Sequence, residues 1–225
     1  RRNSVGAWRL VHTAGTGVTG AEEFNSNIYF TTSGTLFSQS TSNAASENTW
    51  SSQATVGTIK QTTYHPMVVQ GLFLCIGNGT NIATIDDAGT FTKNGTPSVT
   101  LADLPPNNEI SAIEKFGVDI VAGTKYGTDY PRAGVWRWDT VSPTYIASDE
   151  IQEIGVNAFI PTDNYMFVQA GNQGRFYYYD GAKLYKKRRI TGDYANKTMQ
   201  MFPNSVTSFR GMAMLGISNS AGNPC

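Results

Sequence analysis

The stretch GLFLCIGNG, residues 71–79, is an apolar run that begins at a glycine and ends in a glycine-rich turn. The same arrangement recurs four more times, as NIYFTTSG (27–34), GVDIVAGT (117–124), NYMFVQAGNQG (164–174) and GMAMLGISN (211–219). A run of five to seven apolar and β-branched residues between turn residues is typical of a β-strand. The chain is therefore interpreted as five copies of one structural unit.

Two positions in these copies keep nearly the same spacing. The first set is separated by 44, 46, 48 and 45 residues and consists of Ser33, Gly77, Gly123, Gly171 and Gly216. The second set is separated by 44, 46, 47 and 47 residues and consists of Asn27, Gly71, Gly117, Asn164 and Gly211. Tight hairpins need a positive φ at a central residue, which Gly or Asn adopts at low cost. Both sets are therefore predicted to lie in hairpin turns.

Other short runs recur in the same order before and after this strand. A first apolar run precedes it, as in ISAIEKF (110–116), VNAFI (156–160) and SVTSF (205–209). A third run follows it, as in TLFS (35–38), IATID (82–86), VWRWD (135–139) and FYYYD (176–180), and a more polar run such as KLYKKRRI (183–190) closes the unit. Four short strands repeated every 40–50 residues are typical of a β-propeller blade. The aspartate after the third strand is expected to cap the next turn.

The predicted fold is an all-β propeller that forms a single domain over residues 1–225, with five four-stranded blades of about 45 residues. The run GAWRLV (6–11) resembles the third-strand motif VWRW, so the last blade is predicted to be shared between the two termini. Such closure pairs the first and last strands and removes exposed sheet edges. The alternative is a five-repeat fragment of a larger propeller.

Composition narrows the classes of function. Only 15% of residues are charged, with 17 basic and 17 acidic, so no net field attracts nucleic acid or an anionic membrane. No apolar run reaches the length of about 18 residues that a transmembrane helix needs, and no signal peptide is recognisable. Cys75 lies within an apolar run and is predicted to be a buried free thiol. Neither the two histidines nor any known motif predicts a catalytic, metal or cofactor site, and the chain is expected not to be an enzyme.

The segment KYGTDYPRAG, residues 125–134, is longer than its counterparts in the other repeats. Loops on a rigid scaffold carry function, and Tyr and Arg are favoured interface anchors. The predicted contact residues for a partner or ligand are Tyr126, Asp129, Tyr130, Arg132 and Trp136. The alternatives are an ordinary long loop and, for the tryptophan, a place in the core between blades.

A basic run stands out in a chain with so few charges. Five of seven consecutive residues are cationic: Lys183, Lys186, Lys187, Arg188 and Arg189. On an outer strand they would discourage edge-to-edge aggregation. Alternatively they form a basic rim that contacts phosphates or an acidic partner, with period-two alternation sending Lys186 and Lys187 to opposite faces.

Low charge, abundant Gly, Asn, Thr and Tyr, and degenerate repeats resemble the β-propeller proteins of tailed-bacteriophage virions, such as tail-nozzle proteins. The resemblance implies a non-catalytic structural module in a virion, a rigid ring that contacts protein subunits or nucleic acid. It covers the whole chain but transfers no functional residue. The blade length is also similar to that of five-bladed lectins, which implies, as the alternative, an extracellular carbohydrate-binding protein for host attachment. A third hypothesis is a glycoside-processing enzyme with carboxylates such as Asp129 and Glu153 at the ring mouth.

Overall fold

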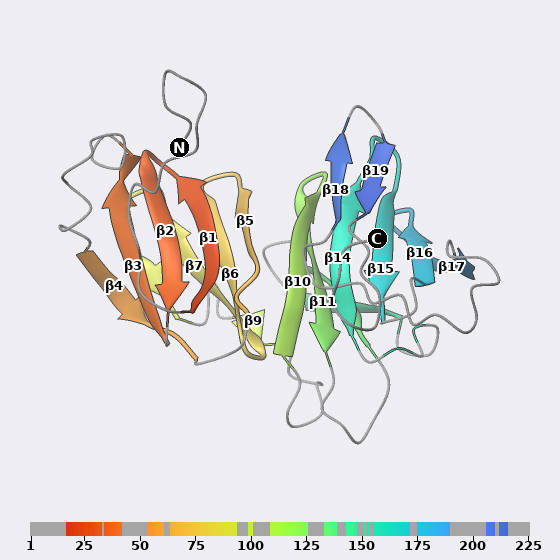
Figure 1. Cartoon of the computed structure of the whole chain (residues 1–225), viewed down its shortest axis with the longest axis horizontal. Helices are drawn as coiled ribbons and strands as arrows, with labels where there is room; N and C mark the ends of the chain where they lie inside the picture. Colours follow the sequence, from red (N-terminus) through yellow and green to blue (C-terminus); the bar gives the residue numbers. More distant parts are fainter. Residues whose placement is uncertain are drawn as a thin grey trace.

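The computed structural model describes residues 17–32, 34–41, 54–60, 64–93, 99–100, 109–125, 133–138, 143–147, 151, 153, 155–171, 175–189, 206–209 and 212–215. Side chains are described for these residues except 99–100, 143–147, 186–189, 206–209 and 212–215. The described residues form antiparallel sheets, each built from strands that are consecutive along the chain (Figure 1). This confirms the all-β prediction.

Each sheet holds its strands in sequence order. The first sheet consists of β1 (Val18–Phe24), β2 (Asn27–Thr32), β3 (Thr35–Ser40) and β4 (Ala54–Thr58). The second consists of β5 (Met67–Gln70), β6 (Phe73–Asn78), β7 (Asn81–Asp86), β8 (Phe91–Thr92) and β9 (Val99–Thr100), where β8 and β9 both pair with β7. The third consists of β10 (Glu109–Phe116), β11 (Asp119–Lys125), β12 (Val135–Trp138) and β13 (Pro143–Ala147). The fourth consists of β14 (Val156–Pro161), β15 (Met166–Ala170), β16 (Arg175–Tyr179) and β17 (Leu184–Arg189). Within the described residues the fifth consists of β18 (Val206–Phe209) and β19 (Met212–Leu215).

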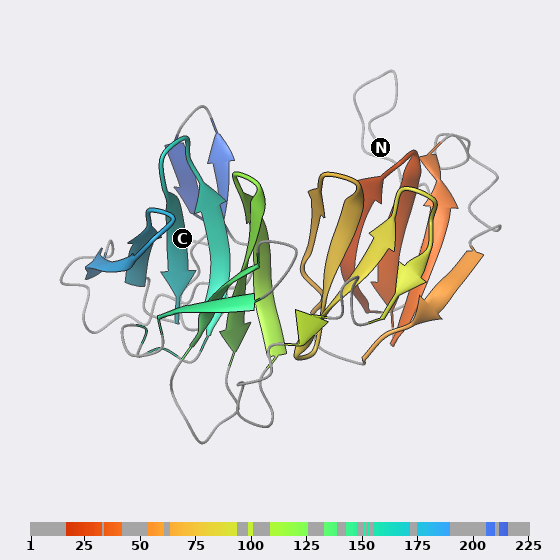
Figure 2. The ribbon, with the colours of Figure 1, turned by 180° about the vertical axis from the view of Figure 1, so that it is seen from behind.

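The sheets are arranged side by side around their first strands. Strand β1 lies beside β5, β5 beside β10, β10 beside β14, and β14 beside β18. In Figure 1, β4 and β17 lie at the two outer edges, and β1, β5 and β10 lie towards the middle. From behind, the yellow second sheet lies between the orange first sheet and the green third sheet (Figure 2). Four-stranded sheets that radiate from neighbouring first strands are the architecture of a β-propeller.

The repeat read from the sequence matches this architecture. The five recurrent runs form the second strand of each sheet, namely β2, β6, β11, β15 and β19. The third-strand motifs form β3, β7, β12 and β16, as predicted. The segment GAWRLV (6–11) lies outside the described residues.

The glycine markers have two different roles. Gly71 (φ 58°) and Gly117 (φ 62°) occupy tight hairpin turns, which confirms the prediction for these positions. Gly77 and Gly123 lie inside β6 and β11, and Asn27 is the first residue of β2, all without a positive φ, so the prediction of turns was wrong there. The described structure supplies a different reason for these two glycines.

Close packing between neighbouring sheets excludes a side chain at both positions. A Cβ at Gly123 would lie 2.5 Å from Cγ1 of Val156, the first residue of β14. A Cβ at Gly77 would lie 3.0 Å from Cγ2 of Ile110 in β10. At Gly20 in β1, a Cβ would collide with the carbonyl oxygen of His65, which precedes β5. A glycine therefore lets each of the second, third and fourth sheets approach the sheet before it.

Three of the first strands, β1, β10 and β14, also have a β-bulge near their beginning. The register shifts at Thr19 in β1, Ser111 in β10 and Asn157 in β14. The hydroxyl of Ser111 donates to the carbonyl oxygen of Val156 at 2.6 Å, which links the third sheet to the fourth. The amide of Asn157 donates to the carbonyl oxygen of Gly171 at 2.7 Å. Bulges bend the strand and redirect a side chain, so a polar residue here can serve the junction between sheets.

At the first junction the bulged residue meets a buried histidine. His65 is 1% exposed, and its Nε2 donates to the carbonyl oxygen of Lys60 at 2.8 Å. Its Nδ1 therefore accepts from the hydroxyl of Thr19, also at 2.8 Å. Burial lowers the pKa of His65, against the opposing effects of the Lys60 carbonyl and the negative charge of Glu109. The imidazole of His65 is therefore neutral in this junction.

The core is divided among the junctions between sheets. Leu36, Leu74 and Ile85 pack between the first and second sheets, and Val121, Val168 and Tyr177 between the third and fourth. Cys75 packs between the second and third sheets, is 1% exposed and forms no disulfide, as predicted. Burial raises the pKa of its thiol to about 12, so it stays protonated at neutral pH.

Replacing Gly123 with alanine should lower the free energy of unfolding by about 2 kcal/mol, because the new methyl group overpacks the junction against Val156. Val118→Ala is the matched control, since Val118 is 81% exposed and its loss should change stability little. Urea denaturation of both variants measures the difference. Equal stability of Gly123→Ala and wild type would contradict the close approach.

The unfolding free energy should decrease as the pH falls below 6.5, the ordinary pKa of histidine, because the unfolded chain then takes up a proton before His65 does. Above that pH the contribution of His65 is fully present. His65→Gln should reduce this pH dependence, whereas His12→Gln, at the other histidine, should retain it. Urea midpoints measured between pH 5 and pH 7.5 test this, and identical pH profiles for wild type and His65→Gln would refute it.

Candidate functional site

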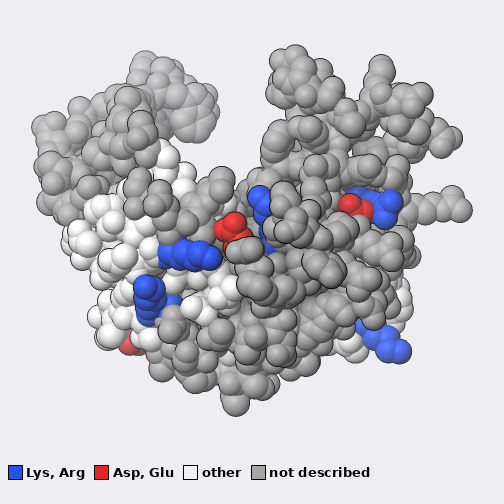
Figure 3. Space-filling model, turned by 90° about the horizontal axis from the view of Figure 1, so that it is seen from below, with Lys and Arg blue, Asp and Glu red and all other residues white. Residues whose placement is uncertain are grey.

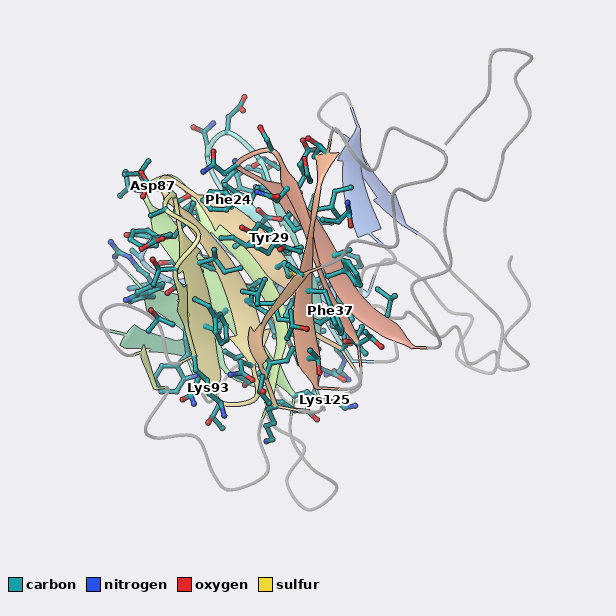
Figure 4. The ribbon with its side chains drawn as sticks, turned by 90° about the vertical axis from the view of Figure 1, so that its left-hand side faces the viewer. Phe24, Tyr29, Phe37, Asp87, Lys93 and Lys125 are labelled. Atoms are coloured by element: carbon teal, nitrogen blue, oxygen red, sulfur yellow. The ribbon has the colours of Figure 1, made fainter. Side chains whose placement is uncertain are left out.

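The two ends of the sheets differ in how their strands are connected. At one end, here called the tight-turn end, short turns at residues 25–26, 71–72, 117–118 and 162–165 join the first two strands of a sheet, and residues 41–53 join β3 to β4. At the other, the long-loop end, residues 59–66, 101–108 and 148–155 connect one sheet to the next and residues 126–134 join β11 to β12, whereas 33–34 and 79–80 are two-residue connections. Figure 4 shows Phe24 and Asp87 at the tight-turn end and Lys93 and Lys125 at the long-loop end. Because the long-loop end carries these connections between sheets and the predicted contact loop, it is the candidate interaction surface.

Hydrogen bonds join neighbouring sheets at the tight-turn end. The amide of Asn25 donates to the carbonyl oxygen of Asp87 at 2.7 Å, and that of Gln70 to Val118 at 2.7 Å. These contacts connect the first sheet to the second and the second to the third.

The aspartates of the third-strand motif cap turns at this end. Asp86 accepts from the backbone N–H of Thr90 at 2.7 Å. Asp180 accepts from those of Ala182 and Lys183 at 2.9 and 2.8 Å, and these hydrogen bonds lower its pKa. The predicted capping role is confirmed for both.

The predicted contact loop departs from the long-loop end. Tyr126, Asp129, Tyr130 and Arg132 themselves lie outside the described residues, and their role stays a prediction. The strands on either side of the loop are held together where it begins and ends. The N–H of Thr124 donates to the carbonyl oxygen of Gly134, and the N–H of Gly134 donates to the hydroxyl of Thr124, both at 2.9 Å. The loop thus begins and ends on a rigid base.

A buried asparagine organises the long-loop end of the second sheet. Asn78 is 2% exposed, accepts from the N–H of Lys60 at 2.6 Å and donates to the carbonyl oxygen of Lys93 at 3.2 Å. Next to it, the N–H of Ile110 donates to Gly79 at 2.8 Å, which attaches the third sheet. Viewed from this end, the described basic groups are separate and do not merge into one patch (Figure 3).

One carboxylate of the enzyme hypothesis lies at this end and is already paired. Glu153 forms an ion pair of 2.9 Å with Arg175 and is 9% exposed. Asp129, its predicted counterpart, lies outside the described residues. Within the described part of the chain, no three His, Cys, Asp or Glu side chains are grouped in a way that could hold a metal ion.

Trp136 is placed in the core. It lies in β12, is 5% exposed and packs with Ile82, Ile113 and Ile120 between the second and third sheets. Such burial favours the packing interpretation of this residue over a ring that stacks on a ligand at the surface.

The basic run lies on an outer strand. Within the described residues β17 pairs only with β16, so it is an edge strand of the fourth sheet, as expected. Lys183 is exposed in the turn before it, whereas the side chains of Lys186, Lys187, Arg188 and Arg189 lie outside the described ones. A register shift in the pairing with β16 interrupts the strict alternation that the sequence predicted for this run.

Sequence reasoning missed an aromatic row on the fourth sheet. Phe167 in β15, Tyr178 in β16 and Tyr185 in β17 are direct cross-strand neighbours, and Tyr165 contacts the first two. The period-two pattern of FYYYD indicates that Tyr178 points away from the core residues Tyr177 and Tyr179. Its pairing with Tyr185 depends on the register that the turn at 180–183 sets.

Two glutamates on first strands are partly buried. Glu22 in β1 and Glu114 in β10 both have a raised pKa, chiefly because burial disfavours the charged carboxylate, and the charge of Glu22 raises that of Glu114 further. The backbone N–H of Lys115 donates to Glu114 at 2.9 Å and partly opposes the shift.

No family model matches the chain, and no curated protein matches its sequence. Among solved structures, a streptogramin B lyase is similar with a TM-score of 0.61 at 12% identity, covering 93% of this chain and 68% of the lyase. A calcium-binding protein, regucalcin from Agrobacterium tumefaciens, is similar with a TM-score of 0.60 at 12% identity, covering 92% and 72%. An ancestral GH74 enzyme gives 0.59 at 11% identity, covering 92% of this chain and 30% of the enzyme.

These three structures are β-propeller proteins. The chain therefore has the β-propeller fold. At such low identity the likeness extends to the fold alone, since one fold hosts many functions.

Within the described residues, no helix has the length and apolar character needed to cross a membrane.

Glu114→Gln should increase the free energy of unfolding at pH 7, because it removes a partly buried charge that Glu22 repels. Asp163→Asn, at an exposed carboxylate in the turn before β15, is the control and should have little effect. The gain should shrink as the pH falls and the wild-type carboxyl takes up a proton. Chemical denaturation at pH 4.5 and pH 7 measures it, and a loss of stability at pH 7 would contradict the assignment.

Proposed function

We propose that this chain is a non-catalytic interaction module, a rigid propeller whose long-loop end contacts other protein subunits of an assembly. The observation that carries the proposal is the contrast between the two ends. At the tight-turn end, hydrogen bonds join turns of neighbouring sheets, whereas the long-loop end carries the connections from one sheet to the next and the predicted contact loop, whose base is closed by hydrogen bonds. A rigid base reduces the entropy lost when a loop binds. The assembly proposed from the sequence resemblance is a virion tail.

The proposed ring has five blades, the last one completed by the N-terminal segment GAWRLV. The first and fourth sheets, which would lie on either side of this last blade, support the proposal because they carry aromatic side chains on the faces turned away from the second and third sheets. Phe30 and Phe37 stack on the first sheet with ring centroids 5.4 Å apart, and Phe167 packs with Phe176 on the fourth. A last blade made of the fifth sheet and GAWRLV would lie between these two faces.

Deleting residues 1–11 should lower the melting temperature by several degrees, because it removes the strand that completes the closing blade. The control deletion of residues 1–5 keeps GAWRLV and should melt like the full chain. Differential scanning calorimetry compares the three proteins. If both deletions melt like the full chain, closure by this segment is wrong.

A photo-crosslinking amino acid at Lys125, on the long-loop end, should capture neighbouring subunits when the chain is in its native assembly. The same amino acid at Val118, which is 81% exposed on the tight-turn end, is the matched control and should capture none. Mass spectrometry of crosslinked peptides identifies the contacts. Crosslinks from Val118 alone would reverse the assignment of the ends, and their absence at both sites would reject it.

A further inference from the structure

The strongest unassigned surface is the aromatic row on the fourth sheet, made of Tyr165, Phe167, Tyr178 and Tyr185. The rings of Tyr178 and Tyr185 stack with centroids 4.6 Å apart and an interplanar angle of 9°. Tyr165 meets Tyr178 edge-on, with centroids 6.1 Å apart and an angle of 69°. Tyr165 and Tyr185 are each 38% exposed. The row therefore ends in an accessible ring on the outermost strand.

The strand that carries Tyr185 also carries the basic run. Strand β17 continues from Tyr185 through Lys186 to Arg189, and exposed Lys183 precedes it. Five of the chain's 17 basic residues thus lie within seven consecutive positions, four of them on this edge strand and one in the turn before it.

Three carboxylates lie near this edge, and one of them, Glu153, is already paired with Arg175, the cross-strand partner of Arg189. Asp180 is engaged by the backbone N–H groups of Ala182 and Lys183 and by the side chain of Tyr185. Asp163 is exposed in the turn before Tyr165. The balance of charge remains positive, so the edge is complementary to a polyanion.

We propose that this edge binds single-stranded nucleic acid. A base stacks on the accessible ring of Tyr185 and extends the Tyr178–Tyr185 stack, while the basic run of β17 neutralises phosphates along the strand. Aromatic rings beside a cationic track are the combination that recognises single strands without reading their sequence. A duplex keeps its base faces paired and stacked, and so offers nothing to the ring.

The proposed site is separate from the long-loop end and does not depend on it. Because the sheets radiate, the outer strands of neighbouring sheets are further apart than the first strands. The ring of Tyr185 can therefore remain accessible in a closed propeller. Failure of subunit crosslinking at Lys125 and failure of nucleic-acid binding here would be distinguishable results.

Fluorescence anisotropy of a labelled 15-nucleotide oligo(dT) with the full chain tests the proposal. Tyr185→Ala should weaken binding about tenfold, the usual loss when one stacked base loses its aromatic partner. Tyr185→Phe keeps the ring and should bind like wild type. Circular dichroism checks that both variants are folded, which is expected at a half-exposed edge residue.

Salt dependence tests the contribution of the basic run. Replacing Lys186 and Lys187 with alanine should reduce the slope of log affinity against log salt by about 1.4, the value for two phosphate contacts on a single strand. Lys115→Ala, at an exposed lysine on the third sheet, is the control and should leave the slope unchanged.

Two competitors distinguish other ligands. Heparin and the duplex of the same sequence should compete less well than unlabelled oligo(dT). The proposal is overturned if oligo(dT) does not bind, if heparin or duplex binds as tightly as oligo(dT), or if Tyr185→Ala leaves affinity unchanged. Binding of a neutral glycan that is lost in Tyr185→Ala, without oligo(dT) binding, would assign the ring to sugars and also overturn it.

Discussion

The close approach between neighbouring sheets is the constraint on which the rest of this structure depends. At three successive junctions a glycine faces the beginning of the next sheet, where a Cβ would collide with His65, Ile110 or Val156. The contact leaves the strands on either side little freedom to slide. Because well-packed interiors tolerate added methyl groups poorly, this geometry fixes the sheets relative to one another.

The bulges complete these junctions with polar contacts. A bulge at Thr19, Ser111 or Asn157 redirects a small polar side chain, and the first two reach the segment that opens the next sheet. Buried polar groups are stable only when they are hydrogen-bonded, so these contacts define a single arrangement. His65 satisfies both ring nitrogens in this way, which ties the first junction to the protonation state of one imidazole.

Division of the molecule into two unlike ends follows from this rigidity. Tight turns between paired strands are short and fastened to their neighbours, and they leave little room for variation. At the opposite end, hydrogen bonds between Thr124 and Gly134 close the base of the loop that joins β11 to β12. The outer edge of the fourth sheet is a third region, where Tyr185 and the basic run are distant from the junctions. Interaction surfaces can therefore vary at two places without disturbing the core.

The sequence by itself determined the order of the first three strands in the repeats, because alternation and turn residues are local properties that survive in degenerate repeats. It also gave the capping role of Asp86 and Asp180, which involves residues only two to four positions away. It did not predict that β8 and β9 both pair with β7 in the second sheet. It misassigned Gly77 and Gly123, since the side chains that exclude a Cβ there come from another sheet. Only the tertiary structure decided that Trp136 is buried and that Tyr178 stacks on Tyr185, because burial and cross-strand register depend on partners that no local pattern specifies.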